Sequence, residues 1–210
     1  MGHSVDLLHR RDSTLNKTKI FLLRHGQTQW NVEGRLQGQK NSPLTEMGVN
    51  QSVEASKLLN QYEIDKAYIS PLQRAIDTSE ILLKGRDVEV ITSDPLKEIY
   101  LGEWEGKLRA EVECSAPEQY QLFLNSSEHF ELQGAETFQQ LQTRLVAELE
   151  AIFAKEKHKN IMVVSHWIAI KTILAHYSDI PLSRLSEISD PENATLIQLE
   201  KDDSGVTVVK

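Results

Sequence analysis

Ile20-Phe21-Leu22-Leu23-Arg24-His25-Gly26-Gln27-Thr28-Gln29-Trp30-Asn31 is the stretch that decides the fold of this chain. Its first four residues form a short apolar run that predicts a buried strand, and a guanidinium, an imidazole and a glycine follow at once. Arginine offers a fork of donors suited to phosphate oxygens, histidine offers a nitrogen nucleophile, and glycine lets the backbone approach a ligand closely. The stretch therefore predicts phosphate chemistry at the end of a strand.

Strands and helices alternate along the rest of the chain. Apolar runs predict strands over residues 19–23, 66–69, 88–92, 161–164, 195–199 and 206–209, with a hairpin turn over 202–205. This alternation predicts an α/β fold, a three-layer sandwich whose mostly parallel central sheet is flanked by helices. Helical spacing predicts one helix over 137–157 and three others with these faces: Val49, Ser52, Ala55 and Leu59; Ala75, Thr78, Ser79 and Leu82; Ile170, Ile173, Leu174 and Tyr177.

Three polar residues follow the ends of predicted strands. His25 comes just after the first strand, Arg74 just after the second, and His166 just after the strand at 161–164. Ligands of open α/β sheets bind outside the carboxyl ends of the strands. We therefore expect these three side chains to share one crevice.

Four segments stand out along the chain: Arg24–Asn31, Ser70–Ala75, Leu96–Gly106 and Val163–His166. They resemble, in the same order, motifs of the histidine phosphatase superfamily, the phosphoglycerate mutase-like proteins. The resemblance spans about residues 19–200 and favours the phosphatase branch, because the chain is short where cofactor-dependent mutases carry an insertion. The segments are Arg24–Asn31, which resembles the opening signature; Ser70–Ala75, the second phosphate-binding arginine motif; Leu96–Gly106, the acid-bearing loop; and Val163–His166, the second histidine motif.

Hydrolysis of a phosphate monoester without a metal needs a nucleophile, positive charge around the phosphoryl oxygens, and an acid for the leaving alcohol. His25 fits the nucleophile, and Arg24 and Arg74 fit the positive charge. The resemblance makes His166 a further phosphate ligand; a capping or core histidine is the alternative at that position. These four residues and Glu98 are the predicted catalytic set.

Glu98 is the predicted proton donor. An unperturbed glutamate, with a pKa of about 4.3, is a poor acid at neutral pH, and we expect the apolar residues that follow Glu98 to raise its pKa. Glu103 and Glu105 are the alternatives from the same loop. The resemblance favours Glu98, because Glu105 belongs to what resembles the structural end of that motif.

The remaining candidates concern the substrate. The resemblance implies that Asn31 and Gln37 contact phosphate oxygens, although both could simply stabilise turns. Thr28 and Trp167 are also assigned to substrate binding. Trp167 departs from the family pattern, which places a small residue after the second histidine, so we expect it to narrow the pocket or to fold into the core. Glu136 begins the predicted long helix, where it could cap the helix or serve catalysis.

Composition excludes several other functions. The net charge of -8 does not suggest a nucleic-acid partner, and no apolar stretch approaches the roughly 20 residues of a membrane span. Cys114 is the only cysteine, so no intrachain disulfide forms, and a cytoplasmic location is expected. The histidines lack metal-ligand spacing, so we expect no metal and no cofactor.

Domain organisation follows from the same pattern. Residues 1–17 are a polar extension that we expect to be disordered, and 18–210 form one catalytic domain. Residues 107–133 interrupt the alternation; they predict a partly helical flap over the crevice, the alternative being a surface excursion with a small core of its own. The predicted function is a metal-independent phosphomonoester hydrolase that acts through a phosphohistidine on a small phosphorylated metabolite. Mutase-type transfer and non-catalytic binding of a phosphate ligand are the alternatives, and a homodimer is left open.

Overall fold

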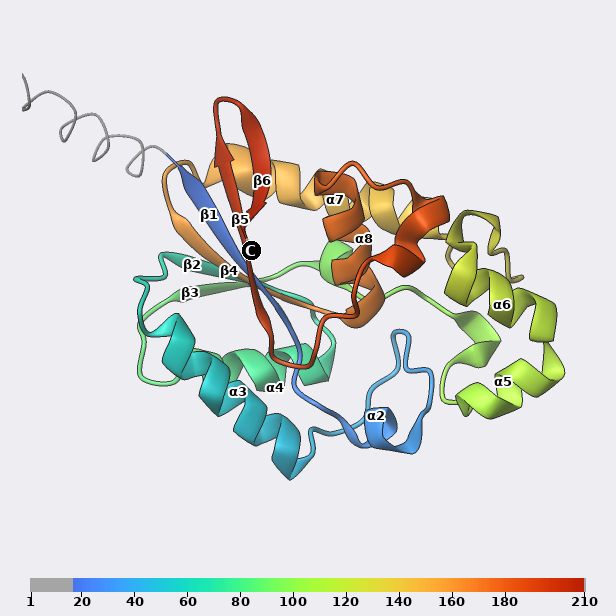
Figure 1. Cartoon of the computed structure of the whole chain (residues 1–210). Helices are drawn as coiled ribbons and strands as arrows, with labels where there is room; N and C mark the ends of the chain where they lie inside the picture. Colours follow the sequence, from blue (N-terminus) through green and yellow to red (C-terminus); the bar gives the residue numbers. More distant parts are fainter. Residues whose placement is uncertain (1–16, 210) are drawn as a thin grey trace, which may run out of the picture.

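The computed structural model describes residues 17–209, so the disorder predicted for the N-terminal extension falls outside the described residues except at Lys17. A six-stranded sheet in the order β3-β2-β4-β1-β5-β6 forms the centre (Figure 1). The first four of these strands are mutually parallel, and β5 and β6 add an antiparallel edge. The predicted mostly parallel sheet is confirmed. The strands are β1 (Thr18–Arg24), β2 (Lys66–Ile69), β3 (Glu89–Thr92), β4 (Asn160–Ser165), β5 (Leu196–Asp202) and β6 (Gly205–Val209).

Helices cover both faces of the sheet. Successive residues of β1 point to opposite faces: Phe21 and Leu23 pack with α3 and α4, whereas Ile20 and Leu22 pack with α7 and α8. Figure 1 shows these two helix pairs on either side of the strands. Because both faces are buried, the central strands are continuous apolar runs rather than alternating ones. The helices are α3 (Glu46–Leu59), α4 (Gln73–Leu82), α7 (Phe138–Lys155) and α8 (Trp167–Tyr177).

Helix α3 packs against the loop that follows β1. Its predicted face is confirmed at Ser52, Ala55 and Leu59, but Val49 is 39% exposed and Gly48 is buried instead. A Cβ atom on Gly48 would lie 2.1 Å from the Gln27 carbonyl oxygen, so only glycine permits this contact. The backbone beyond His25 is thereby fixed against the helix.

The other helices follow the predicted periodicity. Helix α4 buries the predicted face of four residues, and α7 buries Leu141, Leu145 and Leu149. Helix α7 begins one residue later than predicted because Thr137 is its N-cap, and it ends two residues earlier. On α8 the predicted face is only partly buried toward its end, at Leu174 and Tyr177.

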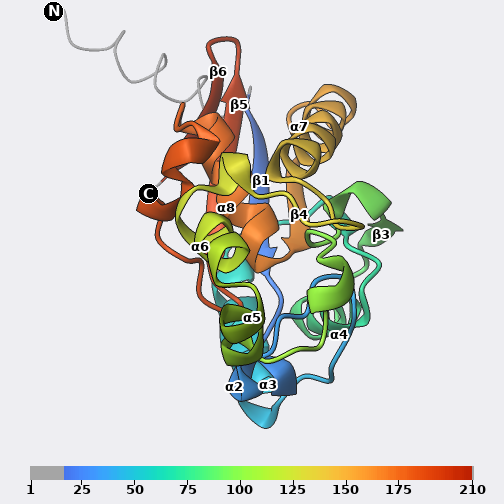
Figure 2. The same cartoon turned by 90° about the vertical axis from the view of Figure 1, so that its right-hand side faces the viewer.

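Residues 107–133 form two short helices, α5 (Arg109–Ser115) and α6 (Pro117–Asn125), and a 3₁₀ turn. Figures 1 and 2 place these helices beyond the carboxyl ends of the parallel strands. Phe123 packs edge-on against Trp104, with ring centroids 6.0 Å apart, and 5.3 Å from the Phe130 ring. These aromatics belong to the same buried cluster as the sheet residues, so the insertion has no separate small core.

Candidate active site

Three predicted residues meet at the ends of β1, β2 and β4. His25 follows β1, Arg74 lies in the first turn of α4, and His166 follows β4 and is the N-cap residue of α8. Their exposed fractions are 2%, 1% and 0%. The two imidazole centroids are 5.3 Å apart, and Arg74 Nε lies 3.3 Å from His25 Nε2. The three side chains expected at the strand ends therefore lie together.

The backbone orients the imidazole of His25. Its Nδ1 lies 2.8 Å from the Gly26 carbonyl oxygen, so Nδ1 carries the proton and Nε2 keeps a lone pair. Burial, followed by the positive charges of Arg74 and Arg24, lowers the pKa of His25 well below its ordinary value. The ring is therefore neutral at pH 7, as a nitrogen nucleophile requires.

Two arginines surround this imidazole with positive charge. Arg74 is fixed by donating to the carbonyl oxygens of Gly38 and Lys40, both at 2.6 Å. Arg24 donates to the Pro191 carbonyl oxygen at 2.8 Å, and its buried Nε has no partner among the described residues. Burial lowers the pKa of each arginine to about 10, so both remain cations at neutral pH.

His166 lies next to His25 and does not line the candidate pocket itself. Its Nε2 is 2.7 Å from the Ser70 hydroxyl, and its Nδ1 is buried with no partner in the described part of the chain. Burial and then the charge of Arg74 lower the pKa of His166 well below its ordinary value. A second neutral imidazole with an unused nitrogen thus stands beside the first.

A candidate pocket opens beside these groups, with Gln37 and Asn31 on its wall. Gln37 is buried, and its Oε1 has no partner within residues 17–209. Asn31 Oδ1 accepts hydrogen bonds from the backbone and hydroxyl of Thr28, at 3.0 and 3.1 Å, which leaves its amide nitrogen for a ligand. Thr28 is fully buried as the N-cap of the short helix α2 (Gln29–Glu33) and does not line the pocket. The expectation that Thr28 binds substrate is thereby corrected: Thr28 positions Asn31.

Glu98 lines the same pocket and is held by the first turn of α8. Its carboxylate accepts backbone hydrogen bonds from Ile99 and Ala169, both at 3.0 Å, and from Ile168 at 3.1 Å. Burial nevertheless raises the pKa of Glu98 above its ordinary value, against the lowering effect of these donors and of Arg74. A buried carboxyl group with a raised pKa, facing a cluster of cations, is suited to donating a proton.

The two alternative acids do not line the pocket. Glu105 Oε1 accepts hydrogen bonds from the backbone of Gln39 at 2.7 Å and of Leu101 at 3.2 Å, so this side chain joins two loops. Glu103 is 68% exposed at its side chain and lies 4.0 Å from Lys107. Geometry therefore favours Glu98 among the three.

A family model described as the histidine phosphatase superfamily (branch 1) matches residues 20–210. The chain belongs to this superfamily. It is 38% identical over 159 residues to a metal-independent phosphoserine phosphatase of Arabidopsis thaliana, across 74% of this chain and 67% of that protein. It is 30% identical to a probable phosphoglycerate mutase of Proteus mirabilis, across 78% and 76%. The solved structure of Bacillus stearothermophilus YhfR superposes with a TM-score of 0.89 at 32% identity, across 91% and 95%. The predicted family and its phosphatase type are confirmed.

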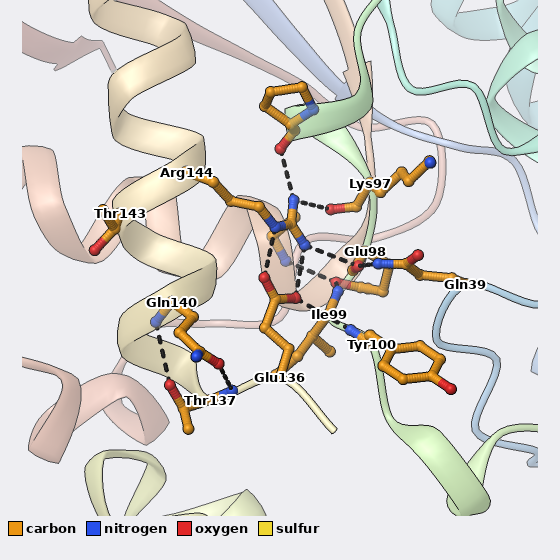
Figure 3. Close-up of polar contacts among 12 residues, drawn as sticks. Gln39, Lys97, Glu98, Ile99, Tyr100, Glu136, Thr137, Gln140, Thr143 and Arg144 are labelled. Carbon is orange, nitrogen blue, oxygen red and sulfur yellow. Dashed lines mark hydrogen bonds and ion pairs between the residues drawn. The ribbon is translucent and has the colours of Figure 1, made fainter. Parts of the chain in front are cut away.

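In this histidine phosphatase, one arginine that the sequence did not single out holds the acid loop. Arg144, on α7, donates to the carbonyl oxygens of Pro95 at 2.6 Å, Lys97 at 2.8 Å and Glu98 at 3.0 Å. The same guanidinium forms a two-pronged pair with Glu136, at 2.6 and 2.8 Å (Figure 3). The backbone that carries Glu98 is therefore attached to α7 through one side chain.

Glu136 has neither of the two roles considered for it from sequence. Thr137 caps α7, and Glu136 Oε2 accepts a hydrogen bond from the Tyr100 backbone at 3.2 Å while pairing with Arg144. Glu136 does not line the candidate pocket. It contacts the acid loop at the Tyr100 backbone, as Figure 3 shows.

Trp167 is half-buried and lines the candidate pocket, together with Phe123 and Arg109 from the insertion. The same side chain also packs against the main core. Arg109 and Arg35 line the pocket as well, and neither was predicted. Within residues 17–209, no helix is long and apolar enough to cross a membrane and no cluster of potential metal ligands occurs; absence of a metal requirement stays a prediction.

Proposed function

We propose that this protein hydrolyses small phosphomonoesters through a phosphohistidine at His25. The observation that carries the proposal is the neutral His25 imidazole, with Nδ1 tied to the backbone and Nε2 directed at Arg74. Nε2 attacks phosphorus, and the bond from phosphorus to the ester oxygen breaks. Arg24 and Arg74 match the two negative charges of a phosphate dianion, and the donors of Gln37 and Asn31 add neutral contacts.

Glu98 supplies and recovers the proton. In the first step its carboxyl group protonates the departing alkoxide, and the alcohol leaves. In the second step the Glu98 carboxylate takes a proton from water, and the resulting hydroxide attacks the phosphohistidine. Inorganic phosphate is released, and both His25 and Glu98 return to their starting protonation states. The phosphatase name of the Arabidopsis relative supports hydrolysis as the outcome.

The first experiment tests the nucleophile. Acid- and base-quenched single turnovers with a labelled ester should trap a label that base preserves and acid removes, and His25→Ala should abolish both label and turnover. His176→Ala, at an exposed histidine outside the pocket, is the matched control. Normal turnover by the His25→Ala protein would refute the mechanism.

The second experiment tests the acid. Glu98→Gln keeps the shape of the side chain but cannot donate an acidic proton, so phosphoryl transfer from an alkyl ester should slow by about 10²–10⁴-fold. Transfer from an aryl ester with an acidic phenol should slow far less, measured as a pre-steady-state burst. Glu103→Gln is the control. Equal losses for both esters would mean that Glu98 does not donate the proton.

Transfer to a second alcohol is the competing outcome, because one relative is named as a probable phosphoglycerate mutase. Supplying 3-phosphoglycerate and following both inorganic phosphate and 2-phosphoglycerate separates the two. We expect phosphate to dominate. The proposed partner is a small phosphorylated ester, and no nucleic-acid partner is proposed. A homodimer remains a prediction, and light scattering would test it by measuring the molar mass in solution. A cytoplasmic location is also proposed, and cell fractionation tests it.

A further inference from the structure

Two peptide planes meet at Gly26, and the second of them carries the acceptor that orients the nucleophile. The Gly26 carbonyl oxygen, which accepts the Nδ1 proton of His25, shares a plane with the backbone N–H of Gln27. The peptide bonds of residues 17–209 are all trans, so the carbonyl and the N–H of one plane point in opposite directions. A group that holds the Gln27 N–H therefore also fixes the direction of the Gly26 carbonyl.

A side chain from α3 holds this N–H. Gln27 N donates to Gln51 Oε1 at 3.0 Å, and the Gln51 side chain makes no other hydrogen bond within the described part of the chain. The start of α3 also receives the loop: Thr45 N donates to the Gln27 carbonyl oxygen at 2.9 Å, and a Cβ atom on Gly26 would lie 2.5 Å from the Gly48 carbonyl oxygen. This close approach requires glycine, whose backbone rotates more freely than that of any other residue.

The preceding peptide plane is fixed from two other elements. Asn193 Nδ2, shortly before β5, donates to the His25 carbonyl oxygen at 2.9 Å, and Gly26 N donates to Thr78 Oγ1 on α4, also at 2.9 Å. The two planes are thus anchored separately. Loss of the Gln51 acceptor would free the plane that carries the Gly26 carbonyl, and rotation of that plane would turn the acceptor away from Nδ1.

The hydrogen bond at Nδ1 matters most while the bond to phosphorus forms. Before substrate binds, Arg74 Nε, which lies 3.3 Å from His25 Nε2, also favours the proton on Nδ1. Nε2 must give up this contact to attack phosphorus, and the ring then gains positive charge. The Gly26 carbonyl alone holds the Nδ1 proton at that stage, and a hydrogen bond from a charged donor is roughly twice as strong as a neutral one.

We propose that Gln51 is a positioning residue for the nucleophile. By accepting a hydrogen bond from Gln27 N, it holds the Gly26 carbonyl against Nδ1 of His25, which keeps Nε2 unprotonated and stabilises the charge of the ring during attack. This inference rests on the proposed function and adds a residue of α3 to it. Because Gln51 lies outside the candidate pocket, its replacement should slow phosphoryl transfer without weakening the binding of phosphate.

Variants at Gln51 separate the acceptor from the bulk of the side chain. Gln51→Met removes the acceptor and should slow the pre-steady-state burst of phosphoryl transfer by about 10- to 100-fold, the range of a hydrogen bond to a charged group. Inorganic phosphate should inhibit with nearly the same Ki, because Arg24 and Arg74 are unchanged. Gln51→Glu keeps an oxygen acceptor and should restore most of the burst rate. Asn50→Met, at the exposed neighbour on the same helix, is the matched control.

A spectroscopic measurement tests the inference without turnover. In protein with ¹⁵N-labelled histidine, the signals that disappear in His25→Ala belong to His25. They should show a proton on Nδ1 that exchanges slowly with water in the wild-type and Gln51→Glu proteins. In Gln51→Met this proton should exchange about 3- to 10-fold faster, the range of a neutral hydrogen bond. If no ester is hydrolysed, the proposed function fails, and exchange of this ring proton still tests Gln51.

Three results would overturn the proposal. A Gln51→Met protein with the wild-type burst rate and ring-proton exchange would show that the acceptor is not needed. Equal losses in Gln51→Met and Gln51→Glu would show that the hydrogen bond is not the cause. Parallel losses of burst rate and phosphate binding would mean that the whole site is disturbed. Urea unfolding checks that Gln51→Met folds; if it does not, Gln51→Ala removes the same acceptor and takes its place in each comparison.

Discussion

Replacing Arg144 should show whether catalysis depends on the position of Glu98 as well as on its proton. Arg144→Met keeps a long apolar side chain on α7 but removes the guanidinium, with all its hydrogen bonds to the acid loop and to Glu136. The variant leaves one carboxylate without its cation and the carbonyl oxygens of Pro95 and Lys97 without a donor. The Glu98 carbonyl oxygen keeps a hydrogen bond from the Gln39 side chain at 3.1 Å. Glu98 itself is unchanged, so any loss of acid catalysis must come from its position.

The expected cost follows from the burial of the pair. Breaking a fully buried ion pair costs about 3–5 kcal/mol, whereas an exposed pair contributes about 0–1 kcal/mol. The side chains of Arg144 and Glu136 are 22% and 14% exposed, close to the buried case. We expect Arg144→Met to lower the free energy of unfolding by about 2–4 kcal/mol, or Tm by roughly 5–15 °C.

The chain provides a closely matched control. Arg184 and Glu187 form a similar two-pronged pair, at 2.6 and 2.7 Å, but with side chains 59% and 50% exposed. Arg184→Met should therefore change stability by less than about 1 kcal/mol. Urea unfolding of both variants compares the same chemistry at two levels of burial.

The catalytic assay asks whether Arg144 acts through Glu98. A displacement of about 1 Å at a catalytic group can cost roughly 10²-fold, so the alkyl-ester burst should slow by 10- to 100-fold and the aryl-ester burst much less. Arg144→Lys should restore part of this difference. Equal slowing of both esters, or stability no lower than in Arg184→Met, would refute a positioning role for Arg144.

Three further predictions concern pH and metals. Because burial raises the pKa of Glu98, its protonated form persists to higher pH than that of an ordinary glutamate. The burst rate of phosphoryl transfer from an alkyl ester should therefore fall as pH rises through that pKa. In Glu98→Gln this fall in the burst rate should be absent. Glu156 has its pKa lowered to about 2, chiefly by its hydrogen bond with Lys159, so its stabilisation is present above the ordinary pKa of about 4.3 and is lost as pH falls toward 2. In urea unfolding Glu156→Gln should cost about 1–2 kcal/mol at pH 7 and little near pH 2. Exhaustive chelation should leave ester hydrolysis intact and vanadate should inhibit it, because Arg24 and Arg74 supply the positive charge; activity that vanishes on chelation and returns with zinc or magnesium would contradict this.

The parts of the site that could be predicted are those set by local sequence. His25 and His166 each follow an apolar run, and both runs form neighbouring parallel strands whose ends must lie at one edge of the sheet. Arg74 follows the same rule at β2. No long-range contact had to be known, because burial of both sheet faces already fixes which residues are strands and where they stop.

The capping role of Thr28 could also have been predicted from its local sequence. Thr28 and Asn31 have the spacing of a reciprocal cap, and the structure contains that cap at the start of α2. The same spacing recurs at Thr137 and Gln140, where α7 begins. Interpreting both pairs as caps would have predicted a structural role for Thr28. It would also have excluded Glu136 as the N-cap of α7.

Arg144 and Arg109 could not have been found in this way. Each lies on a helix, where an arginine ordinarily faces solvent. The groups that each one contacts are distant in sequence: Arg144 donates to the carbonyl oxygen of Glu98, 46 residues away, and the Arg109 guanidinium lies over the Trp167 ring. Only packing of the insertion and of α7 around the strand ends creates these contacts. The groups proposed to bind the phosphate at the strand ends are thus positioned by the sheet, whereas much of the remaining pocket wall comes from residues outside it. Changes in the insertion can therefore alter the pocket wall without disturbing His25, Arg24 or Arg74.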